Sequence, residues 1–238
     1  MKLAFLQRAL AASREGHSAA LLTELKSGRQ SFVENGVATG DVPLEPALAE
    51  ALRVALAEDR NATADAAGGK VFIEVFNPRL RCIIVGAVHI AQPLARMAAL
   101  SGYLVTVVDP RTAFATDERF PGIEMSTEWT DEGLARLKPD RRTAVVTLTH
   151  DPKLDDPALA VALRSGAFYI GALGSKRTHA ARLGRLAELG FKDSDFARIH
   201  GPVGLDIGAI SPSEIAVSIL AQITLVLRGQ RRGKAEAA

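Results

Sequence analysis

One short stretch of the chain passes from an apolar run through a single glycine directly into a helical pattern. The apolar run, residues 80–85, stops at Gly86. Beyond this glycine, the apolar residues Ile90, Leu94 and Met97 recur at helical spacing. A buried strand that ends in a glycine turn and continues into a helix is how a nucleotide-binding α/β domain begins. The stretch therefore predicts a Rossmann-like α/β domain, a parallel sheet with flanking helices.

The sequence departs from the dinucleotide fingerprint G-x-G-x-x-G/A at one position. Gly86 and Ala91 fit the first and third positions, but Val88 occupies the second, where a glycine lets the backbone approach a pyrophosphate. The next predicted strand ends in Asp109, at about the 20-residue spacing of the acid that binds ribose. Arg111 follows, either as a receptor for a 2′-phosphate or as a solvent-exposed loop charge. An NAD(P)-binding oxidoreductase thus stays open, as does a fold that has lost its ligand.

The composition bounds the class of protein. Hydrophobic residues make up 47% of the 238 residues, enough for one large domain and a smaller one. A net charge of +2 lacks the strong positive balance of nucleic-acid or membrane-surface binding. The single cysteine, Cys82, excludes an internal disulfide and fits a reducing, cytoplasmic location. Arg8 interrupts the N-terminal apolar run, which argues against a secretion signal. Residues 215–227 are too few for a membrane helix of about 20 residues.

Residues 1–78 are predicted to form a small α+β domain before the Rossmann-like domain of residues 79–230. The elements expected in it are a hairpin around Gly28, a helix over residues 46–56, a polar loop over residues 61–69 and a strand over residues 70–76. Residues 231–238 are expected to form a flexible tail.

A second glycine-bounded turn joins a later strand to a helix. Gly171 and Gly174 flank the turn, and Ser175 stands where it can cap the helix. Lys176 and Arg177 then fill the first helical turn, where the helix dipole disfavours each positive charge by roughly 0.3–1 kcal/mol. Backbone N–H groups, a hydroxyl and two cations at one helix end suit a phosphate or a similar oxyanion. The alternative is that both long side chains simply point into water.

Other polar residues follow predicted strand ends. The carboxyl ends of parallel strands meet at one edge of the sheet, where open α/β folds bind ligands. The residues expected at this edge are His89, His150, Asp151, His179, His200 and Asp206. The histidines lack the Cys/His pairs of a zinc site, and the chain has no hydrolase or NTPase signature. We therefore assign neither a metal ligand nor a catalytic residue.

Five stretches resemble, in order and spacing, the XdhC/CoxI family of xanthine dehydrogenase accessory proteins. They are residues 83–91, 107–111, 148–153, 169–175 and 200–209. The resemblance covers residues 80–228 and implies the C-terminal Rossmann half of that family. Val88 stands where the family commonly has glycine, and residues 1–78 lack the glycine- and cysteine-containing motifs of a full-length N-terminal domain.

The resemblance implies a maturation factor for molybdenum hydroxylases of the xanthine or carbon monoxide dehydrogenase type. Such a protein is a carrier rather than a catalyst. It binds the molybdenum cofactor (molybdopterin), supports its sulfuration with a cysteine desulfurase, and delivers it to the apoenzyme. Lys176 and Arg177 are then expected to hold the phosphate monoester of molybdopterin, while His89, His150 and Asp206 contact its pterin or dithiolene end. A homodimer and a docking module without a ligand are further possibilities.

Overall fold

The computed structural model describes residues 3–235. The chain divides into two compact units, Met1–Arg79 and Leu80–Ala238. No helix within residues 3–235 is long and apolar enough to span a membrane.

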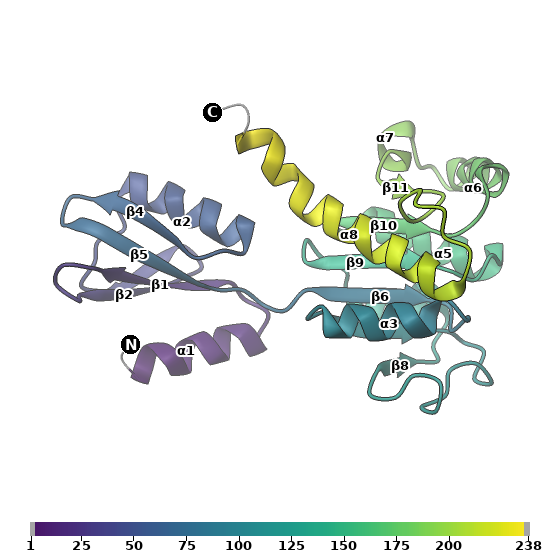
Figure 1. Cartoon of the computed structure of the whole chain (residues 1–238), viewed down its shortest axis with the longest axis horizontal. Helices are drawn as coiled ribbons and strands as arrows, with labels where there is room; N and C mark the ends of the chain where they lie inside the picture. Colours follow the sequence, from purple (N-terminus) through teal and green to yellow (C-terminus); the bar gives the residue numbers. More distant parts are fainter. Residues whose placement is uncertain (1–2, 236–238) are drawn as a thin grey trace. The chain divides into compact units, whose positions relative to one another are not determined.

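The N-terminal unit is an antiparallel sheet with the strand order β3-β2-β1-β5-β4 and a helix on each face (Figure 1). Its elements are α1 (Leu3–Arg14), β1 (Ala19–Glu24), β2 (Gln30–Glu34), β3 (Val37–Gly40), α2 (Pro46–Glu58), β4 (Ala62–Ala66) and β5 (Gly69–Phe76). Successive side chains of a strand point to opposite faces. Ala20 and Leu22 of β1 therefore pack with α2, while Ala19 and Leu21 pack with α1.

The predicted loop over residues 61–69 is wrong, because β4 forms there and pairs with β5. Ala62, Ala64 and Ala66 pack against the core, and the residues between them are exposed. This alternation is typical of a strand with one face packed on the core and the other in water. Alanine, however, is depleted in strands, so the composition of this segment resembled a loop.

The C-terminal unit is a parallel sheet between two layers of helices (Figure 1). Its elements are β6 (Arg81–Val85), α3 (Ala91–Leu100), β7 (Leu104–Val108), β8 (Glu124–Ser126), α4 (Thr130–Leu137), β9 (Thr143–Thr147), α5 (Pro152–Arg164), β10 (Tyr169–Ala172), α6 (Lys176–Glu188), α7 (Asp193–Phe196), β11 (Ile199–His200) and α8 (Pro212–Ala235). The strand order is β8-β7-β6-β9-β10-β11, which is the Rossmann order. The predicted fold class is therefore confirmed.

The two faces of this sheet carry separate cores. Ile84 faces α3 and α8, together with Ile219 and Ile223 of α8. Ile83 and Val85 face the other side, where α4, α5 and α6 pack. Because both faces are covered, the ends of the strands remain as the place where this unit can present polar groups to a ligand.

The order of the strands reverses between β6 and β9. The chain leaves β6 toward β7 on one side and later adds β9 on the other side. The loops after these two strands therefore run in opposite directions, and the crevice that binds ligands in such folds lies outside their carboxyl ends. The turn at Gly86 and the segment that begins at Leu148 flank this position.

The end of the chain differs from the prediction. Helix α8 continues to Ala235, so residues 231–235 of the predicted tail are helical. Residues 236–238 of that tail lie outside the described part of the chain.

Candidate functional site

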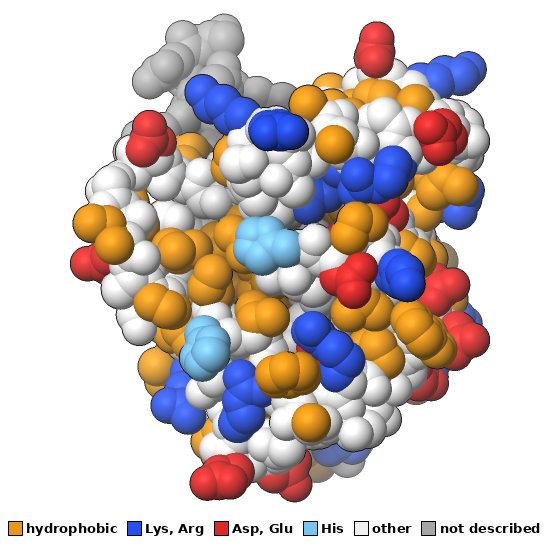
Figure 2. All heavy atoms as spheres, turned by 90° about the vertical axis from the view of Figure 1, so that its right-hand side faces the viewer, with side chains coloured by type: hydrophobic (Ala, Val, Ile, Leu, Met, Phe, Trp, Pro, Cys, Tyr) orange, Lys and Arg blue, Asp and Glu red, His pale blue; other side chains and the backbone are white. Residues whose placement is uncertain are grey.

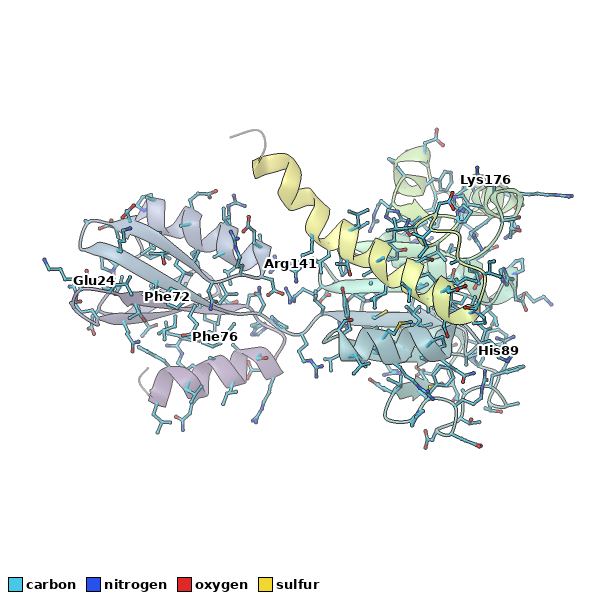
Figure 3. The ribbon with its side chains drawn as sticks, in the orientation of Figure 1. Glu24, Phe72, Phe76, His89, Arg141 and Lys176 are labelled. Carbon is cyan, nitrogen blue, oxygen red and sulfur yellow. The ribbon has the colours of Figure 1, made fainter. Side chains whose placement is uncertain are left out.

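The predicted site residues come to one edge of the sheet. They follow β6 (Gly86, Val88, His89), β7 (Asp109, Arg111), β9 (His150, Asp151), β10 (Gly171, Gly174, Ser175, Lys176, Arg177) and β11 (His200, Asp206), with Gly171 and His200 inside the last residues of their strands. Figure 2 faces this edge, where histidine, lysine and arginine side chains surround exposed hydrophobic groups. His89 and Lys176 lie at the same end of the C-terminal unit in Figure 3.

The first turn depends on a close approach of two loops. Gly86 has a φ of 104°, and a Cβ on it would lie 2.5 Å from Cγ2 of Thr149. Only glycine fits this contact without a shift of the backbone or of Thr149. Val88 is half-buried and packs against the core beneath α3, while His89 is exposed. The loops after β6 and β9 are thus in close contact at Gly86 and Thr149.

Asp109 and Arg111 form an ion pair at the end of β7. The carboxylate of Asp109 is fully buried and accepts hydrogen bonds from Nε and Nη2 of Arg111, at 2.9 and 2.8 Å. It also accepts the backbone N–H groups of Ala87 and Arg111, at 2.7 and 2.9 Å. Burial alone would raise the pKa of Asp109, but the Arg111 side chain and these N–H groups outweigh it and lower that pKa. The predicted ribose acid is therefore engaged within the chain.

The loop after β9 forms the start of α5. His150 adopts a left-handed conformation with a φ of 63° and is exposed. Asp151 caps α5 by accepting the N–H of Lys153 at 2.9 Å. Asp151 therefore has a structural role as well as a place at the edge.

The turn after β10 matches its prediction. Ser175 is the N-cap of α6 and accepts the N–H of Thr178 at 3.1 Å. Lys176 and Arg177 are exposed in the first turn, and Gly174 has a φ of 140°. The cap uses only the Thr178 N–H, so the amide groups of the two cationic residues remain at the helix end.

A buried ion pair that the sequence reasoning missed lies behind this turn. Nη2 of Arg182 is 3.5 Å from Oδ2 of Asp155, and the two side chains are 2% and 1% exposed. The same Nη2 donates to the carbonyl of Leu173 at 2.8 Å, and the Thr149 hydroxyl donates to Asp155 at 2.7 Å. Burial raises the pKa of Asp155 and lowers the pKa of Arg182. The pair thus connects the loops after β9 and β10.

Several polar atoms around this pair have no hydrogen-bond partner. They are Nε and Nη1 of Arg182, Oδ2 of Asp155, Oγ1 of Thr147 and Nδ1 of His179. The sequence did contain a signal: Arg182 stands one helical turn before the buried Leu186, on the face of α6 that packs against the sheet. A charged residue at such a position needs a buried partner.

The loop after β11 is held in place by Tyr169 and Gln222. His200 stacks on Tyr169 with the ring centroids 4.8 Å apart, and burial lowers the pKa of His200. The Tyr169 hydroxyl donates to Oε1 of Gln222 at 2.6 Å, and this oxygen also accepts the Gly204 N–H at 2.9 Å. Asp206 is exposed on the same loop.

A separate apolar groove with a volume of about 830 Å³ lies between α3 and α8. Met97 and Leu100 of α3, and Val217, Leu220 and Leu225 of α8, contribute to its walls. The predicted site residues do not line this groove. Its chemistry is therefore distinct from that of the polar edge.

Comparison with known proteins agrees with this geometry. Residues 82–223 match the model of the XdhC Rossmann domain. The chain belongs to this family. The resemblance inferred from the five sequence stretches is thereby confirmed.

Relatives of this XdhC-family chain are longer than the chain itself. It is 34% identical over 151 residues to the molybdenum cofactor insertion chaperone PaoD of Escherichia coli, covering 63% of this chain and 41% of that protein. It is 36% identical over 154 residues to a probable xanthine dehydrogenase subunit of Bacillus subtilis, covering 64% and 44%. It is 33% identical over 160 residues to the uncharacterized E. coli protein YqeB, covering 66% and 29%. The chain thus spans less than half the length of these relatives.

A solved structure also resembles the chain. The crystal structure of a xanthine dehydrogenase from Bacillus halodurans matches 94% of this chain and 64% of its own, with a TM-score of 0.71 and 26% sequence identity. The match extends well beyond residues 82–223 and therefore includes much of the N-terminal unit.

The single cysteine of this XdhC-family chain is not placed for chemistry. Cys82 lies in β6, is 1% exposed, and burial raises its pKa to about 12. A thiol transfers or accepts sulfur as its thiolate, and burial in an apolar strand suppresses that form.

Proposed function

We propose that this chain binds the molybdenum cofactor at the carboxyl edge of its parallel sheet and assists the maturation of a molybdenum hydroxylase. The family membership supports an accessory role, and the similarity to the insertion chaperone PaoD supports the choice of cofactor. We propose that the chain acts as a carrier rather than a catalyst, because the edge offers groups that bind and orient an anion.

The observation that carries the proposal is the turn between β10 and α6. Molybdopterin ends in a phosphate monoester, and this turn offers first-turn amides with exposed Lys176 and Arg177. Behind it, the guanidinium of Arg182 is almost fully buried and has two nitrogens without hydrogen-bond partners. A buried cation beneath an amide-lined helix start fits an anionic group, so the donor set suits this phosphate. The other end of the cofactor would then meet His89, His150 and Asp206.

The proposed partners are those that the resemblance to the XdhC/CoxI family implies. A cysteine desulfurase is the proposed source of the cofactor's sulfur, and the burial of Cys82 agrees with a sulfur source outside this chain. The apo form of the hydroxylase is the proposed receiver. A cytoplasmic location and a homodimer stay predictions.

The NAD(P)-dependent oxidoreductase gains no support from the site. All the hydrogen bonds that Asp109 would accept from a ribose come instead from Arg111 and Ala87. Val88 also replaces the glycine that a pyrophosphate needs. We therefore do not propose a nicotinamide cofactor.

Titration of the full chain with isolated molybdenum cofactor tests the proposal, with tryptophan or pterin fluorescence as the readout. Replacing Lys176 and Arg177 together by alanine should weaken binding about tenfold or more, since each charge-assisted hydrogen bond contributes about 1.5–3 kcal/mol. The matched control replaces two other exposed cations, Arg96 and Arg141, by alanine. Arg141 precedes β9 and lies at the opposite end of the C-terminal unit from Lys176 (Figure 3).

Two results would contradict the proposal. Wild-type protein that shows no saturable binding of the cofactor would remove the function. If the Lys176 and Arg177 variant binds the cofactor as tightly as the Arg96 and Arg141 variant, the turn is not part of the binding site. The cofactor would then bind at another surface of the chain.

A further inference from the structure

Asp109 has no acceptor capacity left for a ligand. An ionised carboxylate offers about four lone-pair sites. Oδ1 accepts the Arg111 backbone N–H and Nε, and Oδ2 accepts the Ala87 N–H and Nη2 of Arg111. In a dinucleotide-binding domain this acid accepts hydrogen bonds from ribose hydroxyls. Here, the chain itself supplies all four donors.

Arg111 is held on one edge and one face. Nε and Nη2 bond to the carboxylate, and the guanidinium carbon lies 4.8 Å from the centroid of the Phe114 ring. The side chain is 38% exposed, so it is not sealed in the interior. Nη1 takes no part in the bonds to Asp109 and remains as a donor of fixed direction. A guanidinium held in this way loses little conformational freedom when it binds a ligand.

This position therefore offers a hydrogen-bond donor, Nη1 of Arg111, where a dinucleotide-binding domain offers an acceptor; we call this the inverted polarity of the position. We propose that Arg111 is a specificity-determining residue of the crevice, which donates to an acceptor oxygen of the ligand where a dinucleotide-binding domain would accept from a ribose diol. The ligand group favoured here is a phosphate or carbonyl oxygen, which only accepts hydrogen bonds, whereas a ribose diol finds no free acceptor at Asp109. This inference depends on the proposed function only in taking the molybdenum cofactor as the ligand.

The test uses adenosine as the ribose probe, because it has no pyrophosphate and so avoids Val88. Saturation-transfer NMR on the full chain compares adenosine with 2′,3′-dideoxyadenosine, which lacks the diol. Wild type should bind neither at millimolar concentration. Arg111→Ala frees Asp109, so it should bind adenosine at least about tenfold better than wild type and better than the dideoxy analogue. The same variant should lose about tenfold in affinity for the molybdenum cofactor.

Arg119→Ala is the matched control. Arg119 lies on the same loop and its guanidinium contacts the same Phe114 ring at 5.7 Å, but it donates to the Phe114 carbonyl rather than to Asp109. Adenosine and cofactor binding should both stay at wild-type levels in this variant. Arg111→Lys covers the case in which the alanine variant fails to fold, since it keeps the charge but loses the two-point clamp. It should gain adenosine binding to a smaller extent.

The outcomes separate this inference from the function it rests on. Adenosine binding by wild type, or no gain in folded Arg111→Ala or Arg111→Lys, would overturn the inference. If wild type binds the cofactor, unchanged cofactor affinity in Arg111→Ala would also overturn the inference, while loss of affinity in the Lys176 and Arg177 variant would leave the function standing. A gain in adenosine binding in a protein that never binds the cofactor would instead remove the function and keep the inverted polarity.

Discussion

Arg182 and Asp155 form an ion pair inside the C-terminal unit, with Nη2 and Oδ2 3.5 Å apart and both side chains at most 2% exposed. Arg182 also bonds to the turn after β10, and Asp155 bonds to the loop after β9. One pair of charges thus holds two neighbouring loops of the edge together. Its contribution to stability can be measured by removing one of the two charges, because the other charge then stays buried without its partner.

Asp155→Asn should destabilise the protein by about 3–5 kcal/mol, because it leaves the buried Arg182 guanidinium without its ion-pair partner. The double variant Asp155→Leu with Arg182→Met should be much closer to wild type, since it removes both charges at once. Urea unfolding followed by circular dichroism gives both values. An Asp155→Asn variant within about 1 kcal/mol of wild type would show that the pair does not hold these loops.

Gly86→Ala should destabilise the protein more than Gly102→Ala. Both glycines have positive φ, 104° and 92°, so alanine is strained at either by about 1–2 kcal/mol. Only at Gly86 would the new Cβ meet a neighbour, Cγ2 of Thr149 at 2.5 Å, whereas nothing lies within 4 Å at Gly102. Thermal unfolding of the two variants measures the difference. Equal melting temperatures would mean that the two loops do not touch.

Cys82 should be almost inert to thiol reagents in the folded protein. Its pKa is raised from 9.0 to about 12 by burial, so the thiolate fraction at pH 8 falls roughly a thousandfold even before access is considered. Reaction with a chromogenic disulfide at pH 8 should therefore appear only after denaturant is added. Rapid labelling of the native protein would show that the Cys82 thiol is accessible and reactive, and would contradict this prediction.

The Asp109–Arg111 pair should contribute to stability only above the acid range. The folded pKa of Asp109 lies below its ordinary value of 3.8, because hydrogen bonds from Arg111 and Ala87 outweigh the effect of burial. A lowered carboxyl pKa stabilises the fold above the unfolded value, about 3.9, and this contribution disappears as pH falls through the folded value. Wild type and Asp109→Asn should thus differ most above about pH 4 and converge below it. Unfolding free energies from about pH 2 to 6 test this, and a difference that grows toward low pH would contradict it.

Much of the edge was predictable because it depends on local rules. The strand, glycine turn and helix at Gly86 follow from apolar periodicity and from the backbone freedom of glycine. Ser175 caps α6 as predicted, since a serine before a helical pattern satisfies a free N–H. Parallel strands then require that their carboxyl ends share one edge.

The partners of the charged side chains were not predictable from their positions. Asp109 and Arg111 were candidates for two different parts of a nucleotide, yet they bind each other. Arg182 was not a candidate at all, although it stands on the packed face of α6. Edge strand β4 was missed because its inward residues are alanines, which signal a strand weakly.

The amino-acid sequence by itself determined the strands and helices around Gly86 and Ser175, the turns that join them, and the motifs by which the family is recognised, because these depend on neighbours within a few residues of each other. The tertiary structure alone decided which charges are free to meet a ligand. That choice depends on the crossovers of the sheet, which bring residues from distant segments, such as Asp155 and Arg182, within reach of each other and bury them away from water.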